Sequence, residues 1–212
     1  MYIPAANRVE DPAKVRAFIH AHGFATLVSR AGDSDWASHL PVLLEESAQG
    51  ERLLGHMARA NEQWRHLATG GEVLCIFHGP HAYVSPSWYA AKLAVPTWNY
   101  AAVHVYGIPR LEEDGAFLRK ILDDTTSKYE SKREMPWRME FPEDTLSAYM
   151  RAIVGFSVKV TRIEAKFKLG QNRSPEDQAG MLAGLENSGD PEGAALAKFI
   201  RKQGAGPARS LP

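Results

Sequence analysis

About six segments of this chain carry the apolar pattern of β-strands, and the helices between them do not alternate regularly with the strands. A doubly wound parallel sheet needs that alternation and usually offers a glycine-rich phosphate loop. Neither G-x-G-x-x-G nor G-x-x-x-x-G-K-[ST] occurs in the sequence. The pattern therefore predicts a mainly β fold, a small antiparallel barrel with peripheral helices.

The predicted strands are bounded by turn and helix signals. They cover residues 24–29, 37–46, 52–57, 72–79, 97–113 and 154–170. Pro41 falls inside the second strand, which predicts an edge or a bulge at that point. Helices are expected after the capping residues Asp11, Asn61, Asp114, Ser174 and Asp190, and near residues 143–151.

Composition excludes several classes of protein. The chain has 212 residues, 44% of them hydrophobic, enough to bury the core of one domain with at most a small appendage. The 25 basic and 25 acidic residues cancel, so a nucleic-acid role would need a local patch. Cys75 is the only cysteine, which excludes an intrachain disulfide and indicates a reducing cytoplasm. No apolar run has the length of a signal peptide or a membrane span, so we expect a cytoplasmic protein without membrane contact.

Residues 77–107 hold an unusual mixture of aromatic rings, hydroxyls, histidines and one lysine. On a strand, Trp98 and Tyr100 face one way, and Thr97 and Asn99 the other. A stacking ring and an amide suit a flat heterocycle. The alternative is that the two aromatic residues only fill a layer of the barrel.

Two further segments could bind anions. Arg59 at a strand end and Asn61 at a helix start could converge on one anionic group, although an ordinary N-cap beside a solvated arginine explains them equally simply. Residues 166–173 gather basic and amide side chains, either as a solvated strand edge or as a polar claw that reaches a ligand held mainly by another subunit.

His78 and His81 lie on either side of a Gly-Pro pair, which suggests a turn. No cysteine or carboxylate nearby completes a ligand set, so no metal site is predicted. We expect structural histidines near the mouth of a pocket.

Six ordered motifs give the chain a family resemblance. They are YIPAANRVEDP, SHLPVLLE, GHMARANEQW, FHGPHAYVSPSWY, VPTWNYAAVHVYG and KLGQNR, spread over residues 1–190. Together they resemble the PaiB family, described as FMN-binding negative transcriptional regulators. The resemblance implies a six-stranded antiparallel Greek-key FMN-binding split barrel over residues 1–170, a helical appendage over 171–204 and a flexible tail over 205–212. It also implies a homodimer that holds FMN at the subunit interface.

The resemblance assigns the cofactor-binding residues by position. The phosphate would lie where the third strand meets the next helix, at His56, Arg59 and Asn61. The isoalloxazine edge would lie along Ser38, His39 and Leu40. Thr97, Trp98 and Asn99 would flank the ring, and Lys168, Gln171 and Asn172 would come from the partner subunit. Enzymes of the wider fold family carry a Ser-Arg-Lys triplet at the phosphate, whereas here Ala60 follows Arg59, which implies a modest affinity for FMN.

Three functions stay open at this stage. A flavin-dependent regulator is implied by the family alone, and DNA binding likewise, since no helix-turn-helix with a basic recognition helix is evident. An FMN-dependent oxidoreductase would use His39, His81 or Tyr83 for proton delivery. A haem-binding split barrel is the third possibility.

Overall fold

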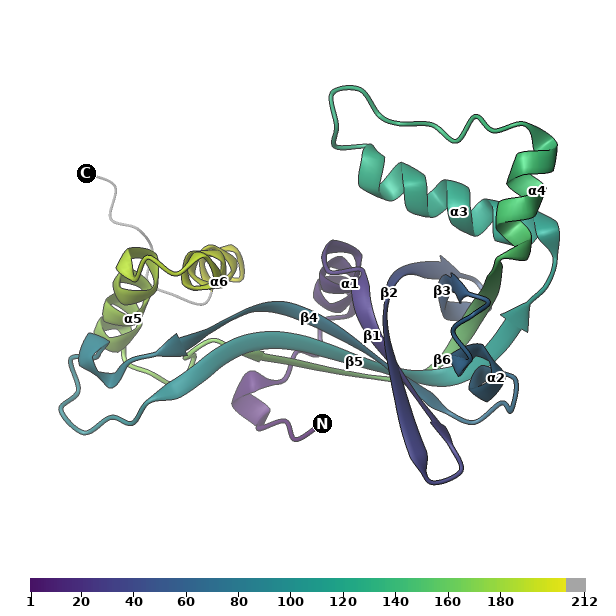
Figure 1. Ribbon diagram of the computed structural model, residues 1–212. Helices are drawn as coiled ribbons and strands as arrows, with labels where there is room; N and C mark the ends of the chain where they lie inside the picture. The colour runs from purple at the N-terminus through teal and green to yellow at the C-terminus, as the bar shows by residue number, and fades with distance from the viewer. Residues whose placement is uncertain (205–212) are drawn as a thin grey trace. The chain divides into compact units, whose positions relative to one another are not determined.

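The computed structural model describes residues 1–204 (Figure 1). The predicted tail, 205–212, lies outside the described residues. The strands are β1 (Phe24–Ala31), β2 (Ser34–Ser47), β3 (Gly50–Ala58), β4 (Val73–Val84), β5 (Thr97–Glu112) and β6 (Ile153–Lys168). The α-helices are α1 (Pro12–Ala21), α2 (Gln63–Leu67), α3 (Gly115–Glu130), α4 (Glu143–Arg151), α5 (Pro175–Asn187) and α6 (Pro191–Lys202), and short 3-10 turns lie at Ala5–Asn7 and Pro86–Trp88.

The strands close into a barrel in the order β1-β2-β3-β6-β5-β4. The pairs β1–β2, β1–β4, β2–β3 and β3–β6 are all antiparallel. The link from β3 to β4 contains α2, which packs on β1 and β2, and it brings β4 beside β1, which is a Greek-key connection. The predicted fold class, a six-stranded antiparallel Greek-key split barrel, is confirmed.

Pro41 marks the point where β2 changes partner. Residues 34–41 of β2 pair with β1, ending at the pair Phe24↔Pro41, and the pairing with β3 begins at Val42↔Gly55. Proline has no backbone N–H to donate to a ladder, so this switch point tolerates it. The predicted irregularity at Pro41 is therefore a change of strand partner.

The chain divides into two compact units. One unit contains Arg16–Phe77 and His104–Ile163, and the other contains Met1–Val15, His78–Val103 and the described residues that follow Ile163. The long strands β4, β5 and β6 contribute residues to both. We describe each unit by itself, as the barrel unit and the terminal unit.

The barrel unit has a dense apolar core. Leu27, Leu53, Phe77 and Phe156 are fully buried. Gly55 has no side chain because the ring of Phe156 fills that space: a Cβ at position 55 would lie 2.6 Å from Phe156 Cζ. Close packing of this kind fixes the register of β3 against β6.

Helices α3 and α4 also belong to the barrel unit, where α3 packs on β2 and β3 (Figure 1). Asp114 caps α3 by accepting a hydrogen bond from the N–H of Ala116 at 3.0 Å, as its sequence position predicts. Leu118 and Ile121 form the buried face of α3. Helix α3 can lie close to β6 because Gly155 has no side chain and leaves room for Leu118.

In the terminal unit, α5 and α6 lie side by side (Figure 1). Ser174 and Asp190 cap them with side-chain oxygens, as predicted. Asp177 of α5 is buried and accepts a hydrogen bond from the N–H of Ala91 at 3.0 Å, which ties the β4–β5 loop to the helix.

The expected turn at His78 and His81 is wrong, because β4 runs through both residues to Val84. Gly79 and Pro80 suggested a break. The pairing of β4 with β1 covers only Leu74 to Ile76, so Pro80 removes no bond from that ladder.

Candidate functional site

The twelve residues implied as cofactor-binding fall into two equal sets, one in each unit. The barrel unit holds Ser38, His39, Leu40, His56, Arg59 and Asn61. The terminal unit holds Thr97, Trp98, Asn99, Lys168, Gln171 and Asn172. The geometry of each set is given within its own unit.

In the barrel unit, Asn61 joins the β3–α2 turn to β2. Its Nδ2 donates a hydrogen bond to the hydroxyl of Ser38 at 2.8 Å, and its Oδ1 accepts one from the N–H of Gln63 at 3.1 Å. The predicted N-cap at Asn61 is wrong by one residue, because the N-cap of α2 is Glu62, which makes no side-chain cap bond. Asn61 instead bonds to the N–H of the first helical residue and brings the turn against the strand that carries Ser38, His39 and Leu40.

Gln63, which the sequence did not single out, reinforces this junction. Its side chain is fully buried, and its Nε2 lies 3.0 Å from the carbonyl oxygen of Leu27, 3.0 Å from Ser29 Oγ and 3.2 Å from the carbonyl oxygen of Trp36. Its position two residues after Asn61, the predicted N-cap, was the one available signal. Sequence spacing does not reveal that such a residue turns inward.

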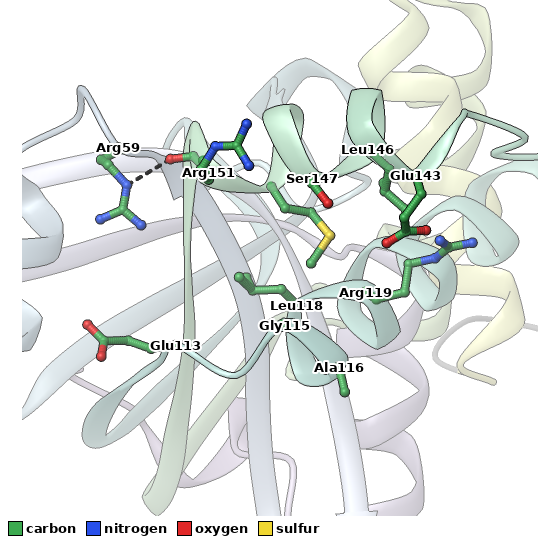
Figure 2. A pocket seen from close by; sticks show the side chains of 11 residues that line it. Arg59, Glu113, Gly115, Ala116, Leu118, Arg119, Glu143, Leu146, Ser147 and Arg151 are labelled. Atoms are coloured by element: carbon green, nitrogen blue, oxygen red, sulfur yellow. Dashed lines mark hydrogen bonds between the residues drawn. The ribbon is translucent and has the colours of Figure 1, made fainter.

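Arg59 is directed toward the end of α4. Its Nε donates to the carbonyl oxygen of Arg151 at 2.9 Å (Figure 2). Its Nη2 donates to the carbonyl oxygen of Ile153 at 3.0 Å. The first bond satisfies a carbonyl group at the C-terminus of α4, and the second satisfies one at the start of β6. The guanidinium is exposed.

Arg59 also lines a pocket of about 550 Å³ between the β3–α2 turn and helices α3 and α4 (Figure 2). Leu118, Leu146 and Met150 contribute apolar walls, and Arg119, Arg151, Glu113 and Glu143 contribute charges. The other eleven implied residues do not line this pocket.

His39 and His56 differ sharply in environment. His39 is exposed, its Nδ1 lies 3.0 Å from Thr26 Oγ1 across the β1–β2 pair, and its ring stacks on Phe24. His56 lies opposite Gly155 on β6, and its buried Nδ1 has no hydrogen-bond partner among the described residues. Burial lowers the pKa of His56 below its ordinary value. Leu40, next to His39 on β2, is half-buried.

In the terminal unit, Trp98 presents an open aromatic face. It is 55% exposed, and its ring centroid lies 6.2 Å from that of Tyr83 and 6.3 Å from that of His81. We call these three exposed side chains the aromatic cluster. Asn99 points to the opposite face of β5, where it is buried with its Nδ2 3.1 Å from Met181 Sδ.

Lys168 and Gln171 are held at the end of β6. The ammonium of Lys168 donates to Thr97 Oγ1 on β5. The Oε1 of Gln171 accepts from the N–H of Leu169 at 2.7 Å, and its Nε2 donates to the carbonyl oxygen of Phe167 at 2.5 Å. Gln171 therefore closes the strand end, while Asn172 beside it is exposed.

Each unit holds side chains of a kind that can bind part of a phosphorylated ring compound. Arg59 and Lys168 supply positive charge, and Trp98 supplies an exposed stacking surface. The amides of Asn61 and Gln171 already bond to the chain, so they shape the two segments. A flavin would itself supply hydride or electron transfer, and the chain would supply binding and orientation.

The closed Greek-key order defines a split barrel. The polar side chains at the β3–α2 turn and at the end of β6 are of a kind suited to a flavin. Residues 1–162 match the family model described as "Putative FMN-binding domain". The chain is 36% identical over 203 residues to "Protease synthase and sporulation protein PAI 2" of Bacillus subtilis, covering 94% of this chain and 96% of that protein. The chain therefore belongs to the PaiB family of FMN-binding-domain proteins.

Solved structures support the fold. The FAD and heme binding protein of Mycobacterium smegmatis aligns with a TM-score of 0.60 at 15% identity, covering 82% of this chain and 79% of that one. The flavocytochrome Anf3 of Azotobacter vinelandii aligns with a TM-score of 0.59 at 14% identity, covering 75% of this chain and 68% of that one. Within residues 1–204, no helix has the length and apolar character needed to span a membrane.

Proposed function

We propose that this protein binds FMN and acts in the cytoplasm as a homodimeric, flavin-dependent regulator. The observation that carries the proposal is the bond from Asn61 to Ser38, which unites the β3–α2 turn with β2 in a chain whose residues 1–162 match an FMN-binding family. The regulatory role rests on the resemblance to the PaiB family, and DNA is its proposed partner.

Each set of residues has a proposed task. Arg59 contacts the phosphate from the β3–α2 turn, with His56 and Asn61 beside it, and Ser38, His39 and Leu40 line the ring edge. Thr97, Trp98 and Asn99 flank the ring, and Lys168, Gln171 and Asn172 reach the same flavin from the partner subunit. A charge-assisted bond to phosphate is stronger than a neutral one, so Arg59 contributes most to the phosphate preference.

The first experiment is an absorbance spectrum of freshly purified protein, followed by an FMN titration monitored by flavin fluorescence. We expect a yellow protein or saturable FMN binding, and a loss of affinity of about tenfold or more for Arg59→Ala. Arg65→Ala is the matched control, because Arg65 is exposed on α2 and pairs only with Glu62 among the ion pairs of the described residues. Absence of FMN binding at saturating ligand contradicts the proposal.

A mixing experiment tests the shared site. Arg59→Ala and Lys168→Ala are each expected to weaken FMN binding when alone. If Lys168 comes from the partner, a mixed dimer of the two variants has one site with both defects and one with neither. An equal mixture, refolded together, then regains about a quarter of the wild-type sites by symmetry. No recovery contradicts the contribution of the partner subunit.

The aromatic cluster favours one alternative, an FMN-dependent oxidoreductase. His81 and Tyr83 lie beside Trp98, so either could deliver a proton to a reduced ring, as could His39. Reduction of bound flavin by NADH or NADPH under anaerobic conditions would favour the enzyme, and salt-sensitive binding to a promoter fragment would favour the regulator. A Soret band would instead indicate haem, which the matched Mycobacterium smegmatis protein binds according to its name.

A further inference from the structure

Gln63 has an unusual set of partners for a residue that begins a helix. Its side chain is fully buried, and three acceptors on β1 and β2 surround its Nε2. An amide nitrogen carries two hydrogens, so the carbonyl oxygens of Leu27 and Trp36 and the hydroxyl of Ser29 share them. One side chain thereby connects the start of α2 to both strands of the hairpin.

The oxygen of the same amide is left unsatisfied. Gln63 Oε1 is buried and has no hydrogen-bond partner among the described residues. An unpaired buried polar atom costs about 1–3 kcal/mol, whereas an apolar residue of the same shape would avoid that cost. A methionine would fit the volume but would leave these acceptors on β1 and β2 without their donor, so the side-chain amide of Gln63 is what joins α2 to the hairpin.

The location of Gln63 suggests what it does. Its backbone N–H bonds to Asn61 Oδ1 at 3.1 Å, and Asn61 Nδ2 bonds to Ser38 Oγ at 2.8 Å. Gln63 thus meets β1 and β2 through its side chain and Asn61 through its backbone N–H, so the turn that follows β3 is held to the hairpin at this residue. A turn that is already ordered loses less conformational entropy when it binds an anion.

We propose that Gln63 is a positioning residue that holds the β3–α2 turn ready for the phosphate of the flavin. The proposal rests on the proposed function. Gln63 acts through Asn61 and Arg59 and has no contact with the ligand itself. Its removal should therefore weaken FMN and leave riboflavin, which has the same ring without the phosphate, almost unaffected.

The test compares the two ligands in one variant. We expect Gln63→Met to weaken FMN binding about tenfold while the affinity for riboflavin stays within about twofold of wild type. A general loss of structure would weaken both ligands together and lower the melting temperature. Equal weakening of both, or of neither, overturns the proposal.

A milder pair of variants keeps the test decisive if Gln63→Met does not fold. Ser29→Ala removes one of the three acceptors, and Ser157→Ala removes a similarly buried hydroxyl that bonds to Glu112 elsewhere in the barrel unit. Only Ser29→Ala should lower the preference for FMN over riboflavin. Equal effects of the two serine variants overturn the role of Gln63. Failure of the wild-type protein to bind FMN contradicts the proposed function itself, and this inference with it.

Discussion

The indole of Trp88 occupies the space that a side chain at Gly184 would need. A Cβ built at that position would overlap three atoms of the ring. A Cβ at Gly180, one turn earlier on α5, would likewise overlap the backbone carbonyl oxygen of Trp88. The two glycines form a flat strip on α5 that receives the tryptophan from the β4–β5 loop.

The first prediction concerns this contact. Gly184→Ala should destabilise the protein by about 1–3 kcal/mol, because the ring must leave its position although alanine suits a helix better than glycine. Urea unfolding measures the change. Gly71→Ala is the control, since its Cβ would meet only Thr69 Oγ1, at 3.8 Å. Trp88→Leu should relieve part of the penalty in the double variant, and strict additivity would argue against the contact.

A second prediction concerns Asn61. Asn61→Ala removes the bonds to Ser38 and to the N–H of Gln63 at the start of α2, so we expect a loss of about 1–2 kcal/mol in unfolding free energy together with weaker FMN binding. Thermal unfolding and the FMN titration measure the two effects. Asn187→Ala, at the exposed end of α5, should change neither. Unchanged FMN affinity in folded Asn61→Ala would remove this residue from the site.

Local signals in the sequence predicted the helices well. Asp114, Ser174 and Asp190 each cap a helix with a side-chain oxygen, because capping depends on neighbours within three residues. The strand pattern and the family resemblance together predicted the barrel. For the candidate site, the sequence singled out Arg59, Asn61 and Trp98, and their part in binding a ligand stays a prediction.

Long-range partners could not be predicted in this way. The bonds from Arg59 reach residues more than ninety positions later in the chain, and Trp88 meets glycines equally distant. Gln63 is polar and begins a short helix, so its position favoured a solvated surface although its side chain is buried. Such contacts depend on the packed topology, and the spacing of residue types along the chain carries no record of it.

The third prediction separates the geometry of Arg59 from its charge. Arg59→Lys keeps the charge but cannot place two fixed donors on the carbonyl groups of Arg151 and Ile153. We expect α4 to exchange its amide hydrogens faster while FMN binding is weakened less than in Arg59→Ala. Hydrogen exchange resolved over residues 143–153 measures the first effect. Arg65→Lys should leave the exchange of α4 unchanged. If α4 exchanges as slowly in Arg59→Lys as in the wild-type protein, the capping role is contradicted.

The last prediction is a pH dependence that originates at His56. Burial lowers the pKa of His56 in the folded protein, so the fold favours the neutral ring. Its contribution to stability is complete above the unfolded pKa of about 6.5 and is lost as the pH falls toward the lower folded pKa. Below pH 6.5, the wild-type protein should therefore lose up to about 1.4 kcal/mol of unfolding free energy for each pH unit through His56. His56→Gln should not show this loss. Urea unfolding between pH 5 and pH 7.5 measures the slope of the unfolding free energy against pH. His78→Gln, at an exposed position on β4, is the control. Equal slopes for wild type and His56→Gln would contradict the assignment.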